Sequence, residues 1–456
     1  MRAAPTTIGA LVALLVGALA APAATLRTRV LAPIPSPGFP ASSLVAPDGT
    51  IYVGTFENPL GDNLPSKVFA FSPTGALERT YTMTGQDLSQ PHGVQVAAID
   101  GHGLLYLLEQ SPSSVVTLNP ASGAQHTYAT FANVPSCSAA PAGAQCSDTL
   151  VDNAPEPDFA AWAPDGSLYV TDYQQALIWR VPPGGGAARV WFTTPLFDGL
   201  LFDDAGIYLE PDHDTLLVDT AASAPTTGTD FADGKLYSLP IEPDGQPGAL
   251  HEIWESGAAQ APDGFAVAQS GDVYIPLVGP GSNAVVEISP DGHQLAAFPD
   301  PLENLLAPVP FDEPASATFD GDQLLTTNES YLAGDAAHQV LFETDVGEPG
   351  APLHQPALAA ATAPSSTPAA APTRLRLVIS PHVLRRGGLV RLRVAVFAGR
   401  APVAGAVVRV LGRDHRTGRL GRVTVRLRVP RRGAALTITV RHAGQATASV
   451  NVRLRR

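Results

Sequence analysis

Short apolar runs of four to six residues recur along most of the chain, and each is bounded by Gly, Pro, Asp or Asn. This texture is typical of strands and turns. One unit, PDFAAWAPDGSLYVTD from Pro157 to Asp172, shows a strand, a turn at Asp165-Gly166 and a second strand. The same unit recurs in six copies, with central turns near residues 48, 102, 165, 212, 270 and 321. The pattern therefore predicts a repeat architecture with a spacing of 47 to 63 residues.

Each copy continues with a second pair of apolar runs joined by a turn rich in Pro and Gly, as in KVFAFSPTGALERTY from Lys67. Four short strands at this period predict one blade of a β-propeller. Six copies predict an all-β fold, a six-bladed β-propeller over residues 25–358. The sixth copy ends in a poor strand, so we expect the run from Leu26 to Ile34 to complete the last blade and protect its edge.

The pattern changes near the C-terminus. Residues 359–373 are rich in Pro, Ala, Ser and Thr and predict a linker. Beyond them, apolar residues alternate with Arg or Thr, which predicts a small β-sandwich over residues 374–456 with its arginines on the solvent face. The segment Pro402-Val403-Ala404-Gly405-Ala406 resembles bacterial Ig-like and carboxypeptidase-regulatory-like modules, which implies an Ig-like sandwich.

The first residues have the features of a targeting segment. Met1-Arg2 precede an apolar run from Ile8 to Ala20 and then small residues, so residues 1–24 predict a secretory signal peptide. An uncleaved anchor is the alternative, although the run is short for a membrane span. We expect no membrane span in the mature chain, and a secreted or cell-surface location.

The chain has two cysteines, Cys137 and Cys146, in one Pro/Gly/Ala-rich loop. In an oxidising compartment such a close pair predicts a disulfide. Metal binding by this pair is disfavoured, because no other Cys or His lies nearby at ligand spacing.

The net charge of −14 hides two opposite parts. Residues 374–456 hold 20 basic residues and one acid, whereas residues 1–373 hold 8 basic residues and 41 acids. The resulting charges of +19 and −33 suggest different partners for the two parts. The secretion signal argues against nucleic acid, so we expect the basic domain to bind an anionic cell-surface polymer, anionic lipid heads or the acidic propeller. A merely solvated basic face remains the alternative.

The start of a blade's innermost strand lies near one mouth of the central channel. In the six aligned copies this position is occupied by Ala41, His92, Asp158, Ala205, Asp263 and Ala315. The ionisable members are candidates for chemistry: Asp158 and Asp263 as catalytic residues, and His92 with the nearby Glu156 as substrate-binding residues. The structural alternatives are a turn cap for Asp263 and a hydrogen bond to a neighbouring blade for His92.

Other carboxylates follow the second strand of several copies. Their recurrence across blades predicts a structural role in turns for Glu57, Glu109, Asp172 and Asp219.

The segment Pro262-Asp263-Gly264 resembles the Pro-Asp-Gly segment of the senescence marker protein and gluconolactonase family. Members of that family are six-bladed propellers with a divalent cation in the channel, and they often hydrolyse lactones. The resemblance implies that Asp263 is a metal ligand, and it places Asp158 where the family has a substrate-contacting asparagine. Ala41 and Ala205 stand where the family has its other two ligands, so we expect a cation, Ca²⁺ by preference, held by Asp263, Asp158 and water.

The function that follows is a secreted, lactonase-like hydrolase that acts on a small molecule with a divalent metal in its channel. One alternative is a non-catalytic propeller that binds a ligand or a protein and whose metal site has degraded. The second alternative is a lyase like those of other propellers with NHL-type repeats.

Overall fold

The computed structural model describes residues 26–199, 202–222, 233–279, 282–356, 375–380, 383–398, 401–418, 422–431, 435–442 and 448–455. The predicted signal peptide, 1–24, and linker, 359–373, lie outside the described residues. The chain divides into two compact units, residues 1–360 and 361–456, which are described separately here. Among the described residues, we find no helix with the length and apolar character that crossing a membrane requires.

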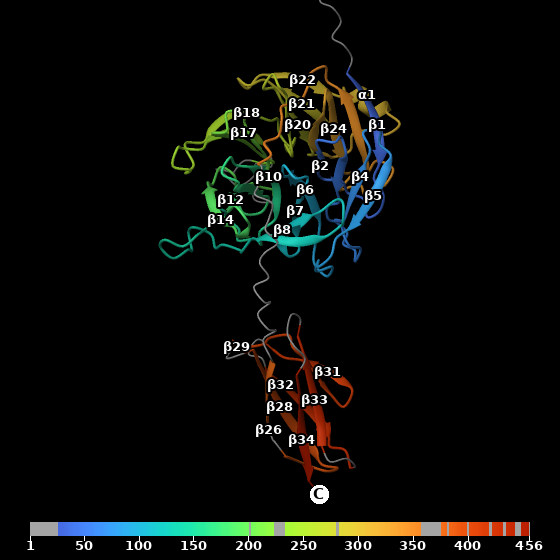
Figure 1. Ribbon diagram of the computed structural model, residues 1–456, viewed down its shortest axis with the longest axis vertical. Coiled ribbons are helices and arrows are strands. Elements are labelled where there is room, and N and C mark those ends of the chain that lie inside the picture. Colours follow the sequence, from blue (N-terminus) through green and yellow to red (C-terminus); the bar gives the residue numbers. More distant parts are fainter. Residues whose placement is uncertain are drawn as a thin grey trace, which may run out of the picture. The chain divides into compact units, whose positions relative to one another are not determined.

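The first unit contains six blades of four antiparallel strands (Figure 1), and one of the six sheets carries a fifth, short parallel strand. In five blades the strands follow chain order from the inside outward, whereas the outermost strand of the sixth is the N-terminal one. The first blade comprises β2 (Ser43–Val45), β3 (Ile51–Gly54), β4 (Lys67–Phe71) and β5 (Leu77–Thr82). The second comprises β6 (Val94–Ile99), β7 (Leu105–Gln110), β8 (Ser113–Leu118) and β9 (Gln125–Thr130). The third comprises β10 (Pro157–Trp162), β11 (Leu168–Asp172), β12 (Leu177–Val181) and β14 (Arg189–Thr193), with β13 (Gly186–Ala187) pairing on β9.

The other three blades repeat this plan. The fourth comprises β15 (Asp204–Leu209), β16 (Thr215–Thr220), β17 (Lys235–Pro240) and β18 (His251–Glu255). The fifth comprises β19 (Ala266–Val267), β20 (Val273–Leu277), β21 (Ala284–Ile288) and β22 (Gln294–Phe298), followed by a short helix α1 (Pro301–Leu306). The sixth comprises β23 (Pro314–Asp320), β24 (Gln323–Asn328), β25 (Val340–Asp345) and β1 (Arg27–Pro33).

The N-terminal strand closes the ring. β1 pairs antiparallel with β25, from Arg27 opposite Asp345 to Pro33 opposite Val340. This confirms the expectation that the first strand of the propeller completes its last blade. The all-β, six-bladed fold predicted from the repeats is likewise confirmed by the strand order.

The core of the propeller lies between blades. Six hydrophobic clusters each join residues of two adjacent blades, as where Leu44 and Tyr52 of the first blade pack with Val94 and Leu107 of the second. Another cluster brings Leu31 of β1 against Phe69 of the first blade. Because a blade buries both faces against its neighbours, its strands carry apolar residues on both sides, which explains the continuous apolar runs in the sequence.

The disulfide Cys137–Cys146 forms as predicted, with a Cα–Cα distance of 4.8 Å. It closes a loop of the segment that connects the second and third blades. A disulfide over this short sequence separation fixes its own loop and leaves the blades to be held by their cores.

The second unit consists of two sheets around one apolar core. One sheet contains β26 (Leu375–Ser380), β28 (Leu389–Ala398), β29 (Ala401–Pro402) and β32 (Arg422–Arg428). The other contains β27 (Val383–Arg385), β30 (Val407–Val410), β31 (Arg413–Arg416), β33 (Ala435–Arg441) and β34 (Ala448–Arg455). The core joins residues of both sheets, such as Val394 and Ile438, so the unit is a β-sandwich.

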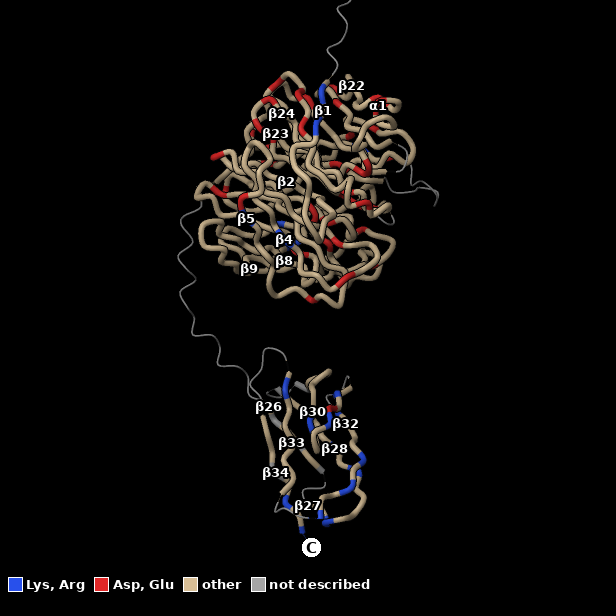
Figure 2. The backbone as a smooth tube through the Cα atoms, turned by 90° about the vertical axis from the view of Figure 1, so that its right-hand side faces the viewer, with Lys and Arg blue, Asp and Glu red and all other residues tan. Residues whose placement is uncertain are grey.

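The basic residues lie where the alternation predicts. Along β32, Arg422, Arg426 and Arg428 are exposed, while Val425 and Leu427 between them are buried. Figure 2 shows basic residues spread over the sandwich and acidic residues over the propeller. The Ig-like type of the sandwich stays a prediction.

Candidate functional site

The inner strands surround the central channel of the propeller. Neighbouring inner strands contact one another, as β10 does with both β6 and β15. A backbone bridge between Gly264 and Ser316 joins the inner segments of the fifth and sixth blades in the same way. Side chains at the start of these strands therefore share one space, and we call that end of the channel the mouth.

Asp158, at the start of β10, is 4% exposed. Its Oδ1 accepts a hydrogen bond from the Gln95 amide of the neighbouring blade, while Oδ2 is buried without a hydrogen-bond partner. Burial raises the pKa of Asp158 well above its usual range, and the charge of Asp263 raises it further. Asp158 is therefore a buried acid with one oxygen still available to a ligand.

Asp263 is half-buried, and its Oδ1 accepts the backbone N–H of Gly264 at 2.8 Å. Burial raises the pKa of Asp263 to about 7, against the lowering effect of that N–H. Asp158 and Asp263 thus act on each other within one site. Their assignment as metal ligands and catalytic residues stays a prediction.

His92 forms its hydrogen bonds with other groups than these two carboxylates. Its Nδ1 lies 2.8 Å from the Gln90 carbonyl and its Nε2 lies 2.8 Å from the Leu64 carbonyl, with Asp62 at 3.7 Å. The residue that reaches Asp158 from the second blade is Gln95. Both ring nitrogens of His92 are thus occupied by backbone, which favours the structural interpretation over substrate binding.

The alignment of the copies explains this difference. Asp158 and Asp263 each stand seven residues before the central turn of their unit, near 165 and 270. His92 stands ten residues before the turn near 102, and the residue seven before it is Gln95. A β-bulge between Val96 and Ala98 adds to the offset. Counting from the turn, rather than from the Pro-x-Gly signal, would have selected Gln95.

Glu156, the other predicted substrate-binding residue, lies two residues before Asp158. Its Oε1 accepts a hydrogen bond from Gln110 Nε2 at 2.6 Å, and its backbone N–H donates to Asp172 at 2.9 Å. Burial raises the pKa of Glu156 to about 8, and the charges of Glu57 and Asp172 contribute. Glu156 is thus an acidic side chain that a hydrogen bond fixes in place at the mouth of the channel.

The second strands of the blades divide their polar residues between two roles. Counted from the first apolar residue of each strand, the fifth position is occupied by Thr55, Glu109, Asp172, Thr220, Leu277 and Asn328. Asp172 accepts from Glu156 N and from Trp179 Nε1, and Asn328 Nδ2 donates to the carbonyls of Pro310 and His338. The structural role predicted for Asp172 agrees with these bonds, and that predicted for Glu109 agrees with the hydrogen bond it accepts from Gln86 Nε2 at 2.8 Å.

The fourth and sixth positions face the other way, because side chains alternate along a strand. They include Asp219 at the fourth position, and Tyr173 and Glu329 at the sixth. Asp219 Oδ2 and Glu329 Oε1 are buried without a hydrogen-bond partner. Burial raises the pKa values of both, and the charge of Asp263 adds to each shift. Asp219 and Glu329 therefore lie with the channel carboxylates. The sequence predicted a structural role in turns for Asp219 and did not single out Glu329.

The side chain of Asp219 lies against Gly206, a glycine of the inner strand. Its Oδ1 accepts the backbone N–H of Gly206 at 2.6 Å. A Cβ at Gly206 would lie 3.1 Å from that oxygen and 2.6 Å from the Phe265 ring. The inner strand of the fourth blade thus leaves room for a carboxylate from the second strand.

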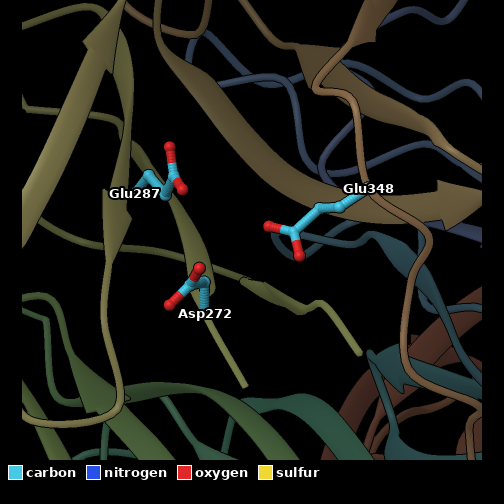
Figure 3. A group of neighbouring side chains, drawn as sticks. All are labelled: Asp272, Glu287 and Glu348. Carbon is cyan, nitrogen blue, oxygen red and sulfur yellow. The ribbon is translucent and has the colours of Figure 1, made fainter. Parts of the chain in front are cut away.

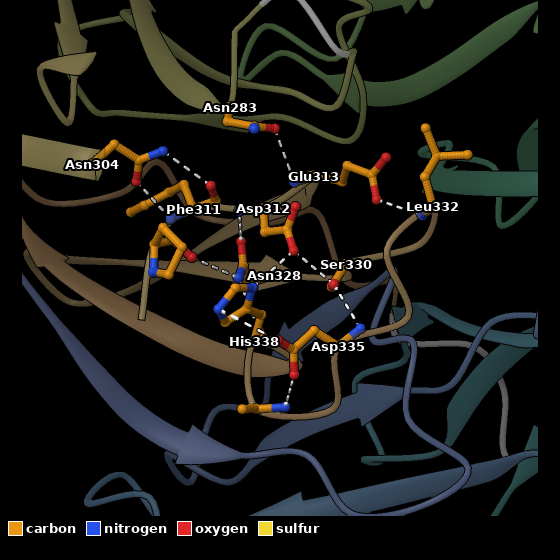
Figure 4. A network of polar contacts seen from close by, with 12 residues as sticks. Asn283, Asn304, Phe311, Asp312, Glu313, Asn328, Ser330, Leu332, Asp335 and His338 are labelled. Atoms are coloured by element: carbon orange, nitrogen blue, oxygen red, sulfur yellow. Dashed lines mark hydrogen bonds and ion pairs between the residues drawn. The ribbon is translucent and has the colours of Figure 1, made fainter. Parts of the chain in front are cut away.

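Glu329 and Tyr331 flank Ser330, whose backbone has a φ of 49°. Figure 4 shows the network that holds this turn: Ser330 Oγ donates to Asp312 Oδ2 at 2.7 Å, and His338 Nδ1 contacts the same oxygen at 2.9 Å. The Ser330 N–H also donates to the Asp312 carbonyl at 2.8 Å. A conformation that is costly for serine is therefore fixed by a buried network, which sets the positions of the two flanking side chains.

The far end of the channel is covered by residues 349–356, which we call the strap. Leu353 and His354 of the strap lie beside the ends of the inner strands, at Ala98, Ala161 and Leu209. Its backbone bonds to several blades: Gly350 N to Gly321 O at 3.0 Å, Ala351 N to Val267 O at 2.8 Å, and Pro356 O from Gly101 N at 3.2 Å. The strap thus crosses the end of the channel opposite the carboxylates.

A separate acidic group lies near the strap end of the fifth blade. Among the described residues, Asp272, Glu287 and Glu348 are the one set of three His, Cys, Asp or Glu residues whose ligand atoms all lie within 4.8 Å of one another (Figure 3). Tyr274 donates its hydroxyl to Glu348 at 2.7 Å. No three of the described channel carboxylates form such a set, so at most two of them could be ligands of one bare ion.

The buried side chain of Glu109 is expected to make the folding stability depend on pH. It is 3% exposed, and burial raises its pKa from 4.5 to about 7, opposed by a hydrogen bond from Gln86. The folded chain then holds this proton more tightly than the unfolded chain, so we expect stability to fall as pH rises from about 4.5 to 7, by up to about 3 kcal/mol from this residue. Glu109→Gln keeps the acceptor oxygen and removes the titration, and urea unfolding across this range should show a flatter profile. The exposed Glu78→Gln is the control, and equal slopes for both variants would contradict the effect.

We compared the chain with known proteins. No family model matches it, and no curated protein does. Among solved structures, a catalytically inactive virginiamycin B lyase from Staphylococcus aureus has 13% identity and a TM-score of 0.42, over 70% of this chain and 99% of that one. A luciferin-regenerating enzyme has 10% identity and a TM-score of 0.46, over 73% and 99%. The aldose sugar dehydrogenase of Streptomyces coelicolor, in its PQQ-bound form, has 13% identity and a TM-score of 0.43, over 71% and 99%. At these values the similarities add nothing to the argument for function, and the propeller fold stands on the strand pairing of this chain.

Proposed function

We propose that the channel is the active site of a hydrolase that acts on a small lactone or ester, with a divalent cation bound at Asp158 and Asp263. One observation carries the proposal: Asp158 Oδ2 is buried without a partner beside a second acid. A buried carboxylate needs a proton, a hydrogen bond or a cation, and the described ion pairs give neither acid a Lys or Arg partner.

The donor set suits a hydrated cation. Ala41 and Ala205 offer no side-chain ligand, and their carbonyls already accept hydrogen bonds from Thr327 and Thr171. Two carboxylates would therefore leave most of the coordination sphere to water and substrate. When bound, a divalent cation polarises a carbonyl group and makes its bound water more acidic.

The chain's own residues would position the reacting groups. Gln95 fixes the Asp158 carboxyl through Oδ1, and the Gly264 N–H fixes Asp263. Tyr173 keeps its phenolic proton, because burial and the charges of Asp263 and Asp158 raise its pKa. Its hydroxyl is thus a hydrogen-bond donor for a carbonyl oxygen that gains negative charge during attack by water.

A non-catalytic, ligand-binding propeller is the second candidate. It is favoured by the three alanines at aligned inner positions, Ala41, Ala205 and Ala315, which supply no functional group. In this candidate the metal site has degraded, so the two candidates differ in both metal binding and turnover, and one series of measurements separates them.

The expected result for the unmodified protein is thermal stabilisation by Ca²⁺, Mn²⁺ or Zn²⁺, of about 2.7 kcal/mol at one hundred times the Kd. Asp263→Asn should lose this stabilisation and, with it, at least about a hundred-fold in hydrolysis rate, since an amide binds hard cations less well. Calorimetric titration and a panel of lactones and esters measure the two effects.

Asp272→Asn, in the acidic group near the strap, is the matched control and should behave as the unmodified protein. Absence of both metal stabilisation and turnover would favour the ligand-binding candidate, and metal binding without turnover on any member of the panel would contradict the hydrolase. Loss of metal binding in Asp272→Asn, with Asp263→Asn unaffected, would move the metal out of the channel.

A further inference from the structure

The mouth of the channel carries three carboxylates among three aromatic rings. We call this group the mouth ring, and it consists of Glu57, Glu156, Glu329, Phe56, Tyr173 and Tyr331. These residues come from the sixth, first and third blades, each just beyond a second strand or just before an inner strand. All except Glu329 are half-buried, so they can meet both water and a ligand.

The mouth ring is held by bonds between blades. The Tyr331 hydroxyl of the sixth blade donates to Glu57 Oε1 of the first blade at 2.6 Å. The Tyr331 ring lies 6.2 Å from the ring of Phe56. From the second blade, Gln110 donates to Glu156 at 2.6 Å. The group is thus positioned before any ligand arrives, which lowers the entropic cost of binding.

Glu329 supplies the observation that points to a ligand. It is 5% exposed, and its Oε1 has no hydrogen-bond partner. No ion pair among the described residues joins Glu57, Glu156 or Glu329 to a Lys, Arg or His. No basic side chain of the described residues therefore neutralises these three carboxylates, which leaves a proton or a bound cation to do so.

The spacing of the carboxylates selects the size of the partner. Oxygens that share one bare Ca²⁺ lie at about 2.3–2.6 Å from it, so they lie within about 5 Å of one another. Among the described residues, no three acids of the mouth ring meet this condition. A larger cation, whose charge is spread over an alkylated nitrogen, can contact separated carboxylates and aromatic faces at once.

We propose that the mouth ring binds an organic ammonium group, such as a quaternary amine, with Glu329 as its unpartnered carboxylate and Tyr331, Phe56 and Tyr173 as its aromatic walls. Binding of this organic cation does not depend on the proposed metal or on hydrolysis. A substrate that carries such a group would be drawn to the acidic mouth and held with its other end toward Asp158 and Asp263.

The test compares choline with its neutral isostere 3,3-dimethylbutan-1-ol, by calorimetric titration of the full chain in EDTA. Choline should bind at least about ten-fold more tightly than the isostere, because only the cation gains from carboxylates and ring faces. The chelator removes divalent metals, so a positive result does not depend on the proposed metal site. Equal binding of the two compounds, or no choline binding at millimolar concentration, would overturn the proposal.

Variants locate the site. Glu329→Gln should weaken choline binding at least about ten-fold and leave the isostere unchanged, whereas Glu348→Gln, in the acidic group near the strap, should change neither. Tyr331→Leu should weaken choline binding several-fold and Tyr331→Phe much less, because the ring face is retained. The Tyr331 pair keeps the test decisive if Glu329→Gln unfolds, and choline binding that is equal in Tyr331→Leu and the unmodified chain would contradict the assignment.

Discussion

A chain that lacks residues 26–33 is expected to lose on the order of 5 kcal/mol of folding stability or more. The deletion removes the buried side chains of Leu31 and Ala32, which pack with Phe69 and Leu341 in the cluster between the sixth and first blades. It also frees the edge of β25 along the whole β1 register, and an open edge invites pairing between molecules. Urea unfolding and light scattering measure the two effects.

Two controls make this result specific to the closing strand. Leu31→Asp should destabilise strongly, whereas Val30→Asp, at a position 38% exposed, should change little. A synthetic peptide of residues 26–34 should restore stability to the deleted chain, and a scrambled peptide should not. An unchanged unfolding midpoint in the deletion would show that β1 does not hold the ring.

Gly264→Ala is expected to destabilise the chain by about 1–3 kcal/mol, through overpacking at the channel. A Cβ at this position would overlap the Phe159 ring, which is rigid and comes from the third blade. Phe159→Ala removes the obstacle, so the double variant should be less destabilised than the sum of the two single variants, with a coupling of about 0.5–3 kcal/mol. Chemical unfolding of the four proteins gives this cycle directly.

The matched control is Gly257→Ala, whose Cβ would meet only the flexible end of Gln260, at 3.1 Å. It should cost less than 1 kcal/mol, by the small effect expected of surface changes. Strict additivity of Gly264→Ala and Phe159→Ala would mean that the ring and the glycine do not pack as described.

The architecture was predictable because every blade repeats the same local sequence pattern. The Asp165-Gly166 turn and its counterparts mark the hairpins, and the weak sixth copy reveals that another strand must complete it. Turn residues and strand periodicity can both be recognised within short segments of the sequence. The pairing of β1 with β25 is a long-range contact, yet it follows from the need to protect an edge.

The site was predictable in part. Asp158 and Asp263 stand at a regular distance from their turns, so the repeat alone brings them together. His92 was placed with them through its Pro-x-Gly signal, although an irregular strand puts Gln95 at that place. Asp219 and Glu329 come from second strands, and their role depends on which face of the strand they occupy. Counting the fourth and sixth positions of those strands would have found them, but their unpartnered oxygens become visible only with the neighbouring blades in place.

The strap has a mechanical consequence. It leads from the sixth blade toward the second unit, and its bonds to Gly101, Val267 and Gly321 come one after another along the chain. A pulling force on the C-terminal part of the chain would load these hydrogen bonds in sequence, beginning with the one at Pro356. It would break them one at a time. The bonds between β1 and β25 involve residues that precede the strap along the chain, so they would be loaded only afterwards. Tension would thus uncover the strap end of the channel while all six blades remain folded.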